Sequence, residues 1–454
     1  MSESVLSLYL GLALAAAVSV SAEAGGAPPN GPDVYLFESA DRLERTVLIQ
    51  AALERSPSLE AARHAWEATT ERVPQAAALD DPILSYSLAP LSIGDDDARF
   101  GQIISFGQRL PYPGKRSLRG EIAMAEAEAS RFDFEEVRLH LATRASQIFD
   151  DYYLVHRAIE INDEHIDLLG DFQRVATARY AAGTASQQDP LQAEVEIAHL
   201  LHQRLALDTK RRNLIAQINA LIHRRPDLSL PPPPIELPLP EAVGLQTSTL
   251  EEEALANRPE LLRLDAATLA DRSRVELEQL DFRPDFLATG VYNSMWNQGD
   301  HRWLVGVGIT LPLYRKQLRA GVAEAEARLQ QTESDRLEVE DEIRSGVQMA
   351  TDRLEEAHHV IELYRSRVLP ASRDQVSAAV AGFETGGTSF LALIEAERSQ
   401  RTAELRYHAA LASYYSRRAE LERQIGRLPG VNESFPAVAG ETPAGSMEPQ
   451  GDPR

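Results

Sequence analysis

The fold of this chain is decided by residues 303–311, which read Trp303-Leu304-Val305-Gly306-Val307-Gly308-Ile309-Thr310-Leu311. Large apolar side chains fill every second position, and small or polar residues dominate the positions between them. Because successive side chains of a strand point to opposite faces, the alternation predicts a β-strand with one apolar face. Such strands build membrane β-barrels, although a hairpin packed on a soluble core would alternate in the same way. The residues on the candidate lipid-facing side are Trp303, Val305, Val307 and Ile309.

The strand belongs to a predicted hairpin over about 284–311, and a second hairpin is predicted over about 83–109. The two are copies within an internal duplication whose period is near 200 residues. Residues 52–59 return as 254–261, and Leu118-Arg119 returns as Leu318-Arg319. Near the end of each copy, Tyr180 and Gly183 return as Phe383 and Gly386. An ordered series of matches at a nearly constant offset indicates a duplicated chain.

Each copy is otherwise predicted to be helical, so the fold class is mainly α. A first helix is expected at 57–78 and again at 259–280, and a long helical region at 114–178 and 317–380. A short turn then leads to a return helix at 190–223 and 390–425. Three-and-four spacing predicts one packed stripe along the first return helix. That stripe consists of Leu191, Val195, Ala198, His202, Leu205, Ile215 and Ile222.

These patterns divide the chain into six segments. Residues 1–24 read as a signal peptide, because the apolar run Val5–Val20 is short for a membrane helix, although Glu3 stands where a positive charge is usual. An N-terminal extension covers 25–42, and the first repeat covers 43–225. A stiff Pro-rich linker at 226–248 leads to the second repeat at 249–428. The tail at 429–454, rich in Gly, Pro and Glu, is predicted to be disordered.

Composition excludes several classes of function. The 454 residues include 46 Lys and Arg against 69 Asp and Glu, so the formal net charge is −23. That balance argues against nucleic-acid binding, because no basic surface is available to neutralise phosphates. The chain has no Cys, which excludes disulfides, thiol nucleophiles and thiolate metal sites.

No motif of bond chemistry is apparent. The sequence lacks Gly-x-Ser-x-Gly and a Walker-type loop, and His359 with Glu362 would supply too few ligands for zinc. We therefore expect a protein that is not an enzyme and that has no cofactor and no bound metal. A periplasmic adaptor with one coiled-coil hairpin is a further class, but the duplication and the two β-hairpins argue against it.

Two hairpins provide four strands, which cannot close a barrel. In lipid, the open edges of an isolated sheet would leave unpaired backbone groups that each cost several kcal/mol. If the strands lie in a membrane, several chains must contribute to one barrel, and an obligate oligomer follows.

Two copies of helix, hairpin, long helix, turn and return helix resemble the TolC-type outer membrane efflux family, from about Leu43 to Leu428. The most specific marks are Tyr180-x-x-Gly183 and Phe383-x-x-Gly386, together with the Leu-Pro that follows each second strand. The segment 110–116, Leu-Pro-Tyr-Pro-Gly-Lys-Arg, is similar to the heavy-metal efflux branch of that family.

The resemblance implies a homotrimer with a twelve-stranded β-barrel in the outer membrane that continues into a periplasmic α-helical barrel. It further implies a passive exit duct of a tripartite efflux system, contacting outer membrane lipid and working with a periplasmic adaptor protein and an inner-membrane pump. Heavy-metal cations are the cargo that the branch suggests. The alternative within the class is the outer membrane channel of a type I protein secretion system.

The resemblance also assigns roles to the two turns at the helical tips, about 180–190 and 383–393. Gate candidates are Asp189, Glu395 and Phe383, and copies of the two carboxylates around a threefold axis would favour cations. The chain departs from the family at Ala392, which lacks a carboxylate, and at Phe383, which lacks a hydroxyl donor. Residues expected to dock the adaptor are Tyr180, Gly183, Thr184, Ser186, Gly386, Thr388 and Ser389.

Overall fold

A computed structural model of the chain describes residues 37, 41–90, 93, 100–240, 246–296 and 299–430. Apart from Phe37, these residues belong to the unit Asp41–Arg454, which is distinct from the unit Met1–Ala40. The expected signal peptide, the acidic loop 95–97, nearly all of the N-terminal extension and nearly all of the tail lie outside the described residues.

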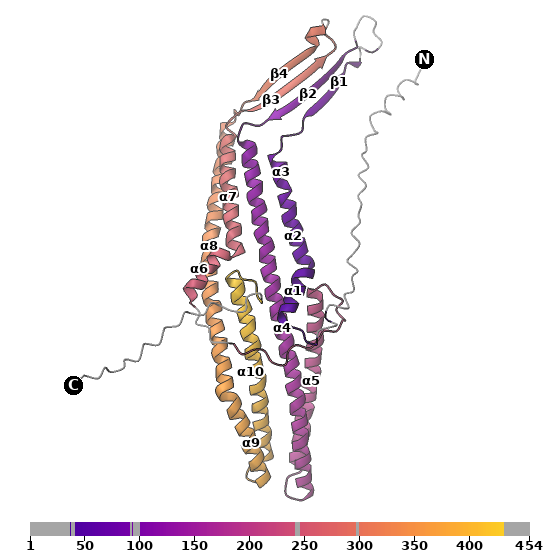
Figure 1. Cartoon of the computed structure of the whole chain (residues 1–454), viewed down its shortest axis with the longest axis vertical. Coiled ribbons are helices and arrows are strands. Elements are labelled where there is room, and N and C mark those ends of the chain that lie inside the picture. The colour runs from indigo at the N-terminus through magenta and orange to yellow at the C-terminus, as the bar shows by residue number, and fades with distance from the viewer. Residues whose placement is uncertain are drawn as a thin grey trace, which may run out of the picture. The chain divides into compact units, whose positions relative to one another are not determined.

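The two copies have the same order of elements (Figure 1). The first contains α1 (Arg45–Arg55), α2 (Pro57–Thr70), α3 (Arg72–Ala77), β1 (Ile83–Leu88), β2 (Gln102–Leu110), α4 (Lys115–Ala181) and α5 (Gln188–Leu221). The second contains α6 (Thr247–Asn257), α7 (Pro259–Leu280), β3 (Asp285–Asn293), the 3₁₀-helix η2 (Gly299–Arg302), β4 (Trp303–Thr310), α8 (Arg315–Leu363), the π-helix η3 (Tyr364–Val368), α9 (Leu369–Thr385) and α10 (Phe390–Gln424). The mainly helical, duplicated fold predicted from the sequence is confirmed.

Two predicted helices are interrupted, and a proline follows each interruption. The helix expected at 57–78 breaks between Thr70 and Arg72, just before Pro74. The long region expected at 317–380 passes through η3 just before Pro370. A proline removes one helical hydrogen bond and crowds the carbonyl four residues earlier, so the helix must adjust there. The repeat offset grows from 200 at Leu318 to 203 at Phe383, and η3 lies within the stretch over which it changes.

The four strands form one antiparallel sheet in the order β1-β2-β3-β4. Each hairpin contributes two strands, and the pairing of β2 with β3 joins the copies. In that pairing Phe106 lies opposite Gly290, and Gly290 lies opposite Val305 of β4. Since paired residues share a face, the register carries the apolar side of β4 across the whole sheet.

The long helix α4 organises the helical part. It has 67 residues, which corresponds to about 100 Å at 1.5 Å per residue, and it packs against α2, α5, α7 and α10. Two apolar clusters lie along the helices, one joining α6, α7, α8 and α10, the other joining α4, α5, α9 and α10. Within the described ranges, no helix combines the length and apolarity needed to cross a membrane.

Within the single chain, most of the stripe predicted to pack along α5 is uncovered. Ile222, which directly follows the last residue of α5, is buried, but Leu191, Val195 and Leu205 are exposed. The side of α5 that faces α4 instead carries Ala193, Leu200, Leu214 and Ile218. Periodicity identifies an apolar side of a helix, but it cannot tell whether a segment of the same chain covers that side.

The segment at 110–116, which resembles the heavy-metal branch, has a structural role. Gly114, with φ of 99°, is the last residue of the connection from β2 to α4. Lys115 begins α4 with only 3% of its surface exposed. The Lys115 ammonium donates to Asp285 at 2.9 Å and pairs with Asp281 at 2.9 Å. Burial alone would lower the pKa of Lys115, but the two carboxylates outweigh it and raise that pKa. The segment thus ties the start of α4 to the second copy.

Replacing Lys115 by Met is expected to destabilise the protein by about 2 kcal/mol, because the ammonium's hydrogen bonds are lost while the partly exposed Asp281 and Asp285 keep some of their hydration. Thermal unfolding of the purified variant measures the loss. Lys316→Met on the exposed side of α8 is the matched control and should leave Tm within about 1 °C of the unmodified protein. Equal melting of the two variants would contradict the structural role of Lys115.

Candidate functional site

One face of the sheet is apolar and open to its surroundings. Val305 is 91% exposed, and the register aligns it with apolar residues of all four strands. The opposite face is mixed: it carries Leu287 and Leu304 beside small and polar side chains, including a hydrogen-bonded pair of hydroxyls from Ser85 and Ser105. An apolar patch of this breadth marks a contact with lipid or protein. It consists of Leu84, Tyr86, Ile104, Phe106, Leu110, Phe286, Tyr292, Trp303, Val305, Val307 and Ile309.

The sheet is also open at its sides. In the described part of the chain, β1 and β4 are the outer strands, and each is paired along one side. An outer strand presents free N–H and C=O groups along its other side, which is a template for pairing with another strand.

At the far end of α4, both turns are built in the same way. Gly183 and Gly386 have positive φ of 70° and 79°, and each ends a long helix. The N–H of Thr184 donates to the carbonyl of Arg179 at 2.9 Å, and that of Gly387 to the carbonyl of Gly382 at 2.8 Å. Both patterns are Schellman caps, in which glycine accepts the left-handed conformation without strain. The aromatic-x-x-Gly spacing is therefore the spacing of a helix cap.

The serines of the turns begin the return helices. Ser389 accepts a hydrogen bond from the N–H of Ala392 at 3.3 Å and caps α10. Ser186 accepts from the N–H of Gln188 at 3.1 Å at the start of α5. These two hydroxyls thus help to shape the tips. The family resemblance had assigned both serines only to docking of the adaptor.

Phe383, one of the three gate candidates, lies in the interior of the tips. The ring is 6% exposed and lies in the apolar cluster against Phe390. The Arg179 guanidinium stacks on the ring, 4.6 Å from its centre, and donates to the Phe383 carbonyl. Phe383 therefore packs the two tips of one chain together in this conformation, and neighbouring chains could only bury it further. An aromatic side chain suits interior packing as well as a gate, and the residue type alone does not distinguish these two roles.

The two candidate carboxylates lie near the starts of the return helices. Asp189 lies in the first turn of α5 and is half-buried, where the helix N-terminus favours negative charge. Glu395 is exposed on α10 and accepts from Arg398 at 2.9 Å. Arg398 also pairs with Glu196 of α5. Because Arg398 neutralises part of its charge, Glu395 contributes less negative potential than the sequence suggested.

A buried charged group that sequence reasoning missed ties α4 to α10. His165 of α4 donates from one ring nitrogen to Glu397 and from the other to Glu404, the latter at 3.1 Å. Both nitrogens can donate only in the charged imidazolium form. Burial by itself would lower the pKa of His165, but the two carboxylates raise it to about 9. The sequence holds no local signal for this cluster, because Glu397 and Glu404 lie 232 and 239 residues away from His165.

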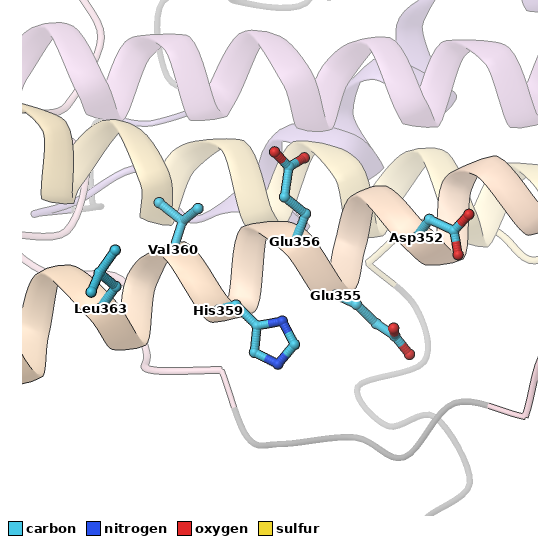
Figure 2. A pocket seen from close by; sticks show the side chains of 6 residues that line it. All are labelled: Asp352, Glu355, Glu356, His359, Val360 and Leu363. Atoms are coloured by element: carbon cyan, nitrogen blue, oxygen red, sulfur yellow. The ribbon is translucent and has the colours of Figure 1, made fainter.

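The helix α8 carries three carboxylates and a histidine around a hollow, Asp352, Glu355, Glu356 and His359. Figure 2 shows a hollow along α8, where Glu355 and His359 project to one side and Glu356 to the other. Glu356 accepts from Arg417 at 2.7 Å, so its charge is already compensated. Among the residues that the structure describes, no group of three or more His, Asp or Glu could hold a metal ion.

Comparisons with known proteins identify related sequences and folds. The sequence model of the family described as outer membrane efflux protein matches residues 48–222 and 250–427. The cobalt-zinc-cadmium resistance protein CzcC of Cupriavidus metallidurans is 23% identical over 406 residues, 87% of this chain and 92% of that protein.

Two solved structures have the same fold. CusC, whose structures describe transmembrane channel formation, matches with a TM-score of 0.73 and 16% identity over 84% of this chain and 92% of its own. The outer membrane protein VceC of Vibrio cholerae matches with a TM-score of 0.70 and 18% identity over 84% of this chain and 96% of its own.

The His165 cluster should make stability depend on pH. The pKa of His165 is raised from 6.5 to about 9, so its contribution is complete below pH 6.5 and is lost as the pH rises through 9. Between pH 7.5 and 9 we expect a loss of about 1.5 kcal/mol, or about 2 °C in Tm. Asp150, with a pKa of about 7, and His408, with a pKa of about 4, titrate mainly below this window.

Thermal unfolding of the purified protein between pH 7.5 and pH 9 measures this loss of stability. His165→Gln should remove the slope, since Gln does not titrate, while melting at a lower temperature throughout. An unchanged slope in that variant would assign the pH dependence to other groups.

Proposed function

The chain belongs to the outer membrane efflux protein family, and from this membership we propose that it is the passive outer membrane exit duct of a tripartite efflux system. The observation that carries the proposal is the separation of two surfaces by α4. An exposed apolar sheet precedes the start of that helix, and a pair of capped tips follows its end about 100 Å away. Such a chain can place its sheet in a membrane and its tips deep in the periplasm.

The proposed duct is a homotrimer. Four strands with open outer edges leave backbone groups that lipid cannot satisfy, so several sheets must join edge to edge. Three copies would give twelve strands, with the apolar face outward and the polar face lining the pore. The long helices would continue this ring as a helical barrel in the periplasm.

The proposed partners are a periplasmic adaptor at the tips and an inner-membrane pump that supplies the energy. The chain itself performs no bond chemistry in this scheme. Heavy-metal cations are the proposed cargo, because the related CzcC is named for resistance to cobalt, zinc and cadmium. Acidic residues near the tips, Asp189 above all, would favour the passage of cations.

The lipid-facing assignment is tested by Val305→Arg, which should block assembly in the outer membrane. A charge near the middle of the lipid layer costs about 2–4 kcal/mol on the outer face of a barrel. Assembly is measured as the heat-modifiable oligomer in purified outer membranes.

The matched control for this test is Leu304→Arg, one residue earlier on the opposite, pore-facing side. It introduces the same charge into the same strand and should assemble. Gly306→Ser is less suitable, because a Cβ there would meet the Thr289 hydroxyl at 2.7 Å. If the Val305 and Leu304 variants assemble equally well, the strands do not lie in lipid.

The charge of the tips is tested in planar bilayers, where the purified channel should prefer cations and be blocked by trivalent cations added from the tip side. Asp189→Ala should weaken both properties more than Glu395→Ala, because Arg398 already offsets Glu395. The double variant should lose most of the block. Glu121→Ala with Asp335→Ala removes two exposed carboxylates elsewhere on α4 and α8 and should change little. If the two double variants have equal effects, the cation selectivity comes from the overall charge of −23 and not from the tips.

A further inference from the structure

The pore face of the sheet, which we define as the face opposite Val305, carries very little charge. Among the Asp, Glu, Lys, Arg and His residues of the chain, the four strands contain only Arg109, near the end of β2, and Asp285, at the start of β3. Arg109 lies opposite Leu287, and Asp285 lies two positions from Leu287 on the same strand. Because alternate residues of a strand share a face, both charges belong to the pore face.

The charge of Asp285 is compensated within the chain. Its carboxylate accepts hydrogen bonds from the Lys115 ammonium and from the N–H of Tyr112, each at 2.9 Å. The Lys115 side chain is only 4% exposed, so this partner is held in place by its surroundings. Asp285 therefore projects little negative potential from the sheet.

The charge of Arg109 is held far more loosely. Its side chain is 69% exposed, and its carboxylate partner in the described part of the chain is Asp80, at 4.0 Å and itself 47% exposed. Exposed pairs at this separation are weak and are screened by salt. The neighbouring positions on this face include two glycines, Gly107 two residues earlier and Gly308 beyond Leu287, so the long side chain has room to move. Arg109 is thus the principal fixed charge of the pore face.

Arg109 stands at the end of the sheet that adjoins the helices. β2 ends at Leu110, and α4 begins at Lys115 (Figure 1). In the proposed homotrimer, copies of Arg109 would surround the opening where the barrel meets the helical part. A guanidinium keeps its charge at every physiological pH, and a ring of such groups favours anions over cations.

We propose that Arg109 is a specificity-determining residue of the duct, which admits small anions to the barrel section and opposes the cation preference set at the tips. The inference rests on the proposed multi-chain duct and gives its two ends opposite charge selectivity. A conducting path must bind its cargo weakly enough to release it. Cations that the acidic tips favour would meet few carboxylates in the barrel, so they would not be retained there.

Planar bilayers test the proposal through the permeability ratio of K⁺ to Cl⁻, obtained from reversal potentials in KCl gradients. Arg109→Gln should raise this ratio about twofold near 0.1 M KCl, where the Debye length is about 10 Å. The difference should vanish near 1 M KCl, where that length is about 3 Å. Asp80→Asn should lower the ratio, because it removes the carboxylate that offsets Arg109. Arg328→Gln, which removes an exposed arginine paired with Glu324 on α8, is the control and should change little.

Restoring the charge chemically separates an electrostatic role from a structural one. The chain has no Cys, so Arg109→Cys provides a single thiol for reagents applied to the open channel. A thiosulfonate that attaches a trimethylammonium group should return the ratio to that of the unmodified protein. One that attaches a sulfonate should raise the ratio further. Phe106→Cys, on the apolar face of the same strand, should respond to neither reagent.

The possible outcomes distinguish this inference from the proposed duct. If the unmodified protein forms channels but Arg109→Gln keeps its permeability ratio and both reagents leave Arg109→Cys unchanged, the role of Arg109 is wrong and the duct survives. If Phe106→Cys responds as Arg109→Cys does, the two faces of the sheet are assigned wrongly. If the unmodified protein forms no channels in the bilayer, both the inference and the proposed duct are overturned.

Discussion

The pairing of β2 with β3 is the interaction on which the rest of the structure depends. It joins strands from different copies and makes one sheet from two hairpins. Once these strands are in register, the helices that follow β2 and precede β3 must start side by side. Lys115 fixes that start, because its ammonium lies between Asp281 and Asp285 of the second copy. The same pairing leaves β1 and β4 as outer strands, so the joining of the copies also leaves the described sheet with two open edges.

Farther along the helices, the copies are held together by an apolar cluster and by ion pairs. Buried ion pairs add little net stability over apolar packing, but a mispaired charge is costly, so they favour one register of the helices. His165 and its two glutamates act in this way between α4 and α10, and Arg398 and Glu196 do so between α10 and α5. A sliding of α10 by one turn would leave Glu397 buried without the imidazolium. The ion pairs thus set the register in which α10 packs on the first copy.

The tips show how local and long-range interactions are combined. The caps at Gly183 and Gly386 depend on a few neighbouring residues, so each turn can form wherever its helix ends. The Arg179 guanidinium then connects one tip to the other through the ring and carbonyl of Phe383. Since this contact joins the ends of two long helices, movement of one tip is coupled to the other within the chain.

The sequence by itself determined what depends on near neighbours or on repetition. The alternation at 303–311, the duplication and the turn glycines were all predicted, because period, offset and backbone conformation are local properties. Only the tertiary structure decided which apolar stripe of α5 is covered, that Phe383 is packed inside, and that Lys115 and His165 are buried among carboxylates. Lys115 and Asp285 are 170 residues apart, and His165 and Glu397 are 232 apart. No periodic pattern connects residues at such separations, so their partners follow only from the way in which the two copies pack.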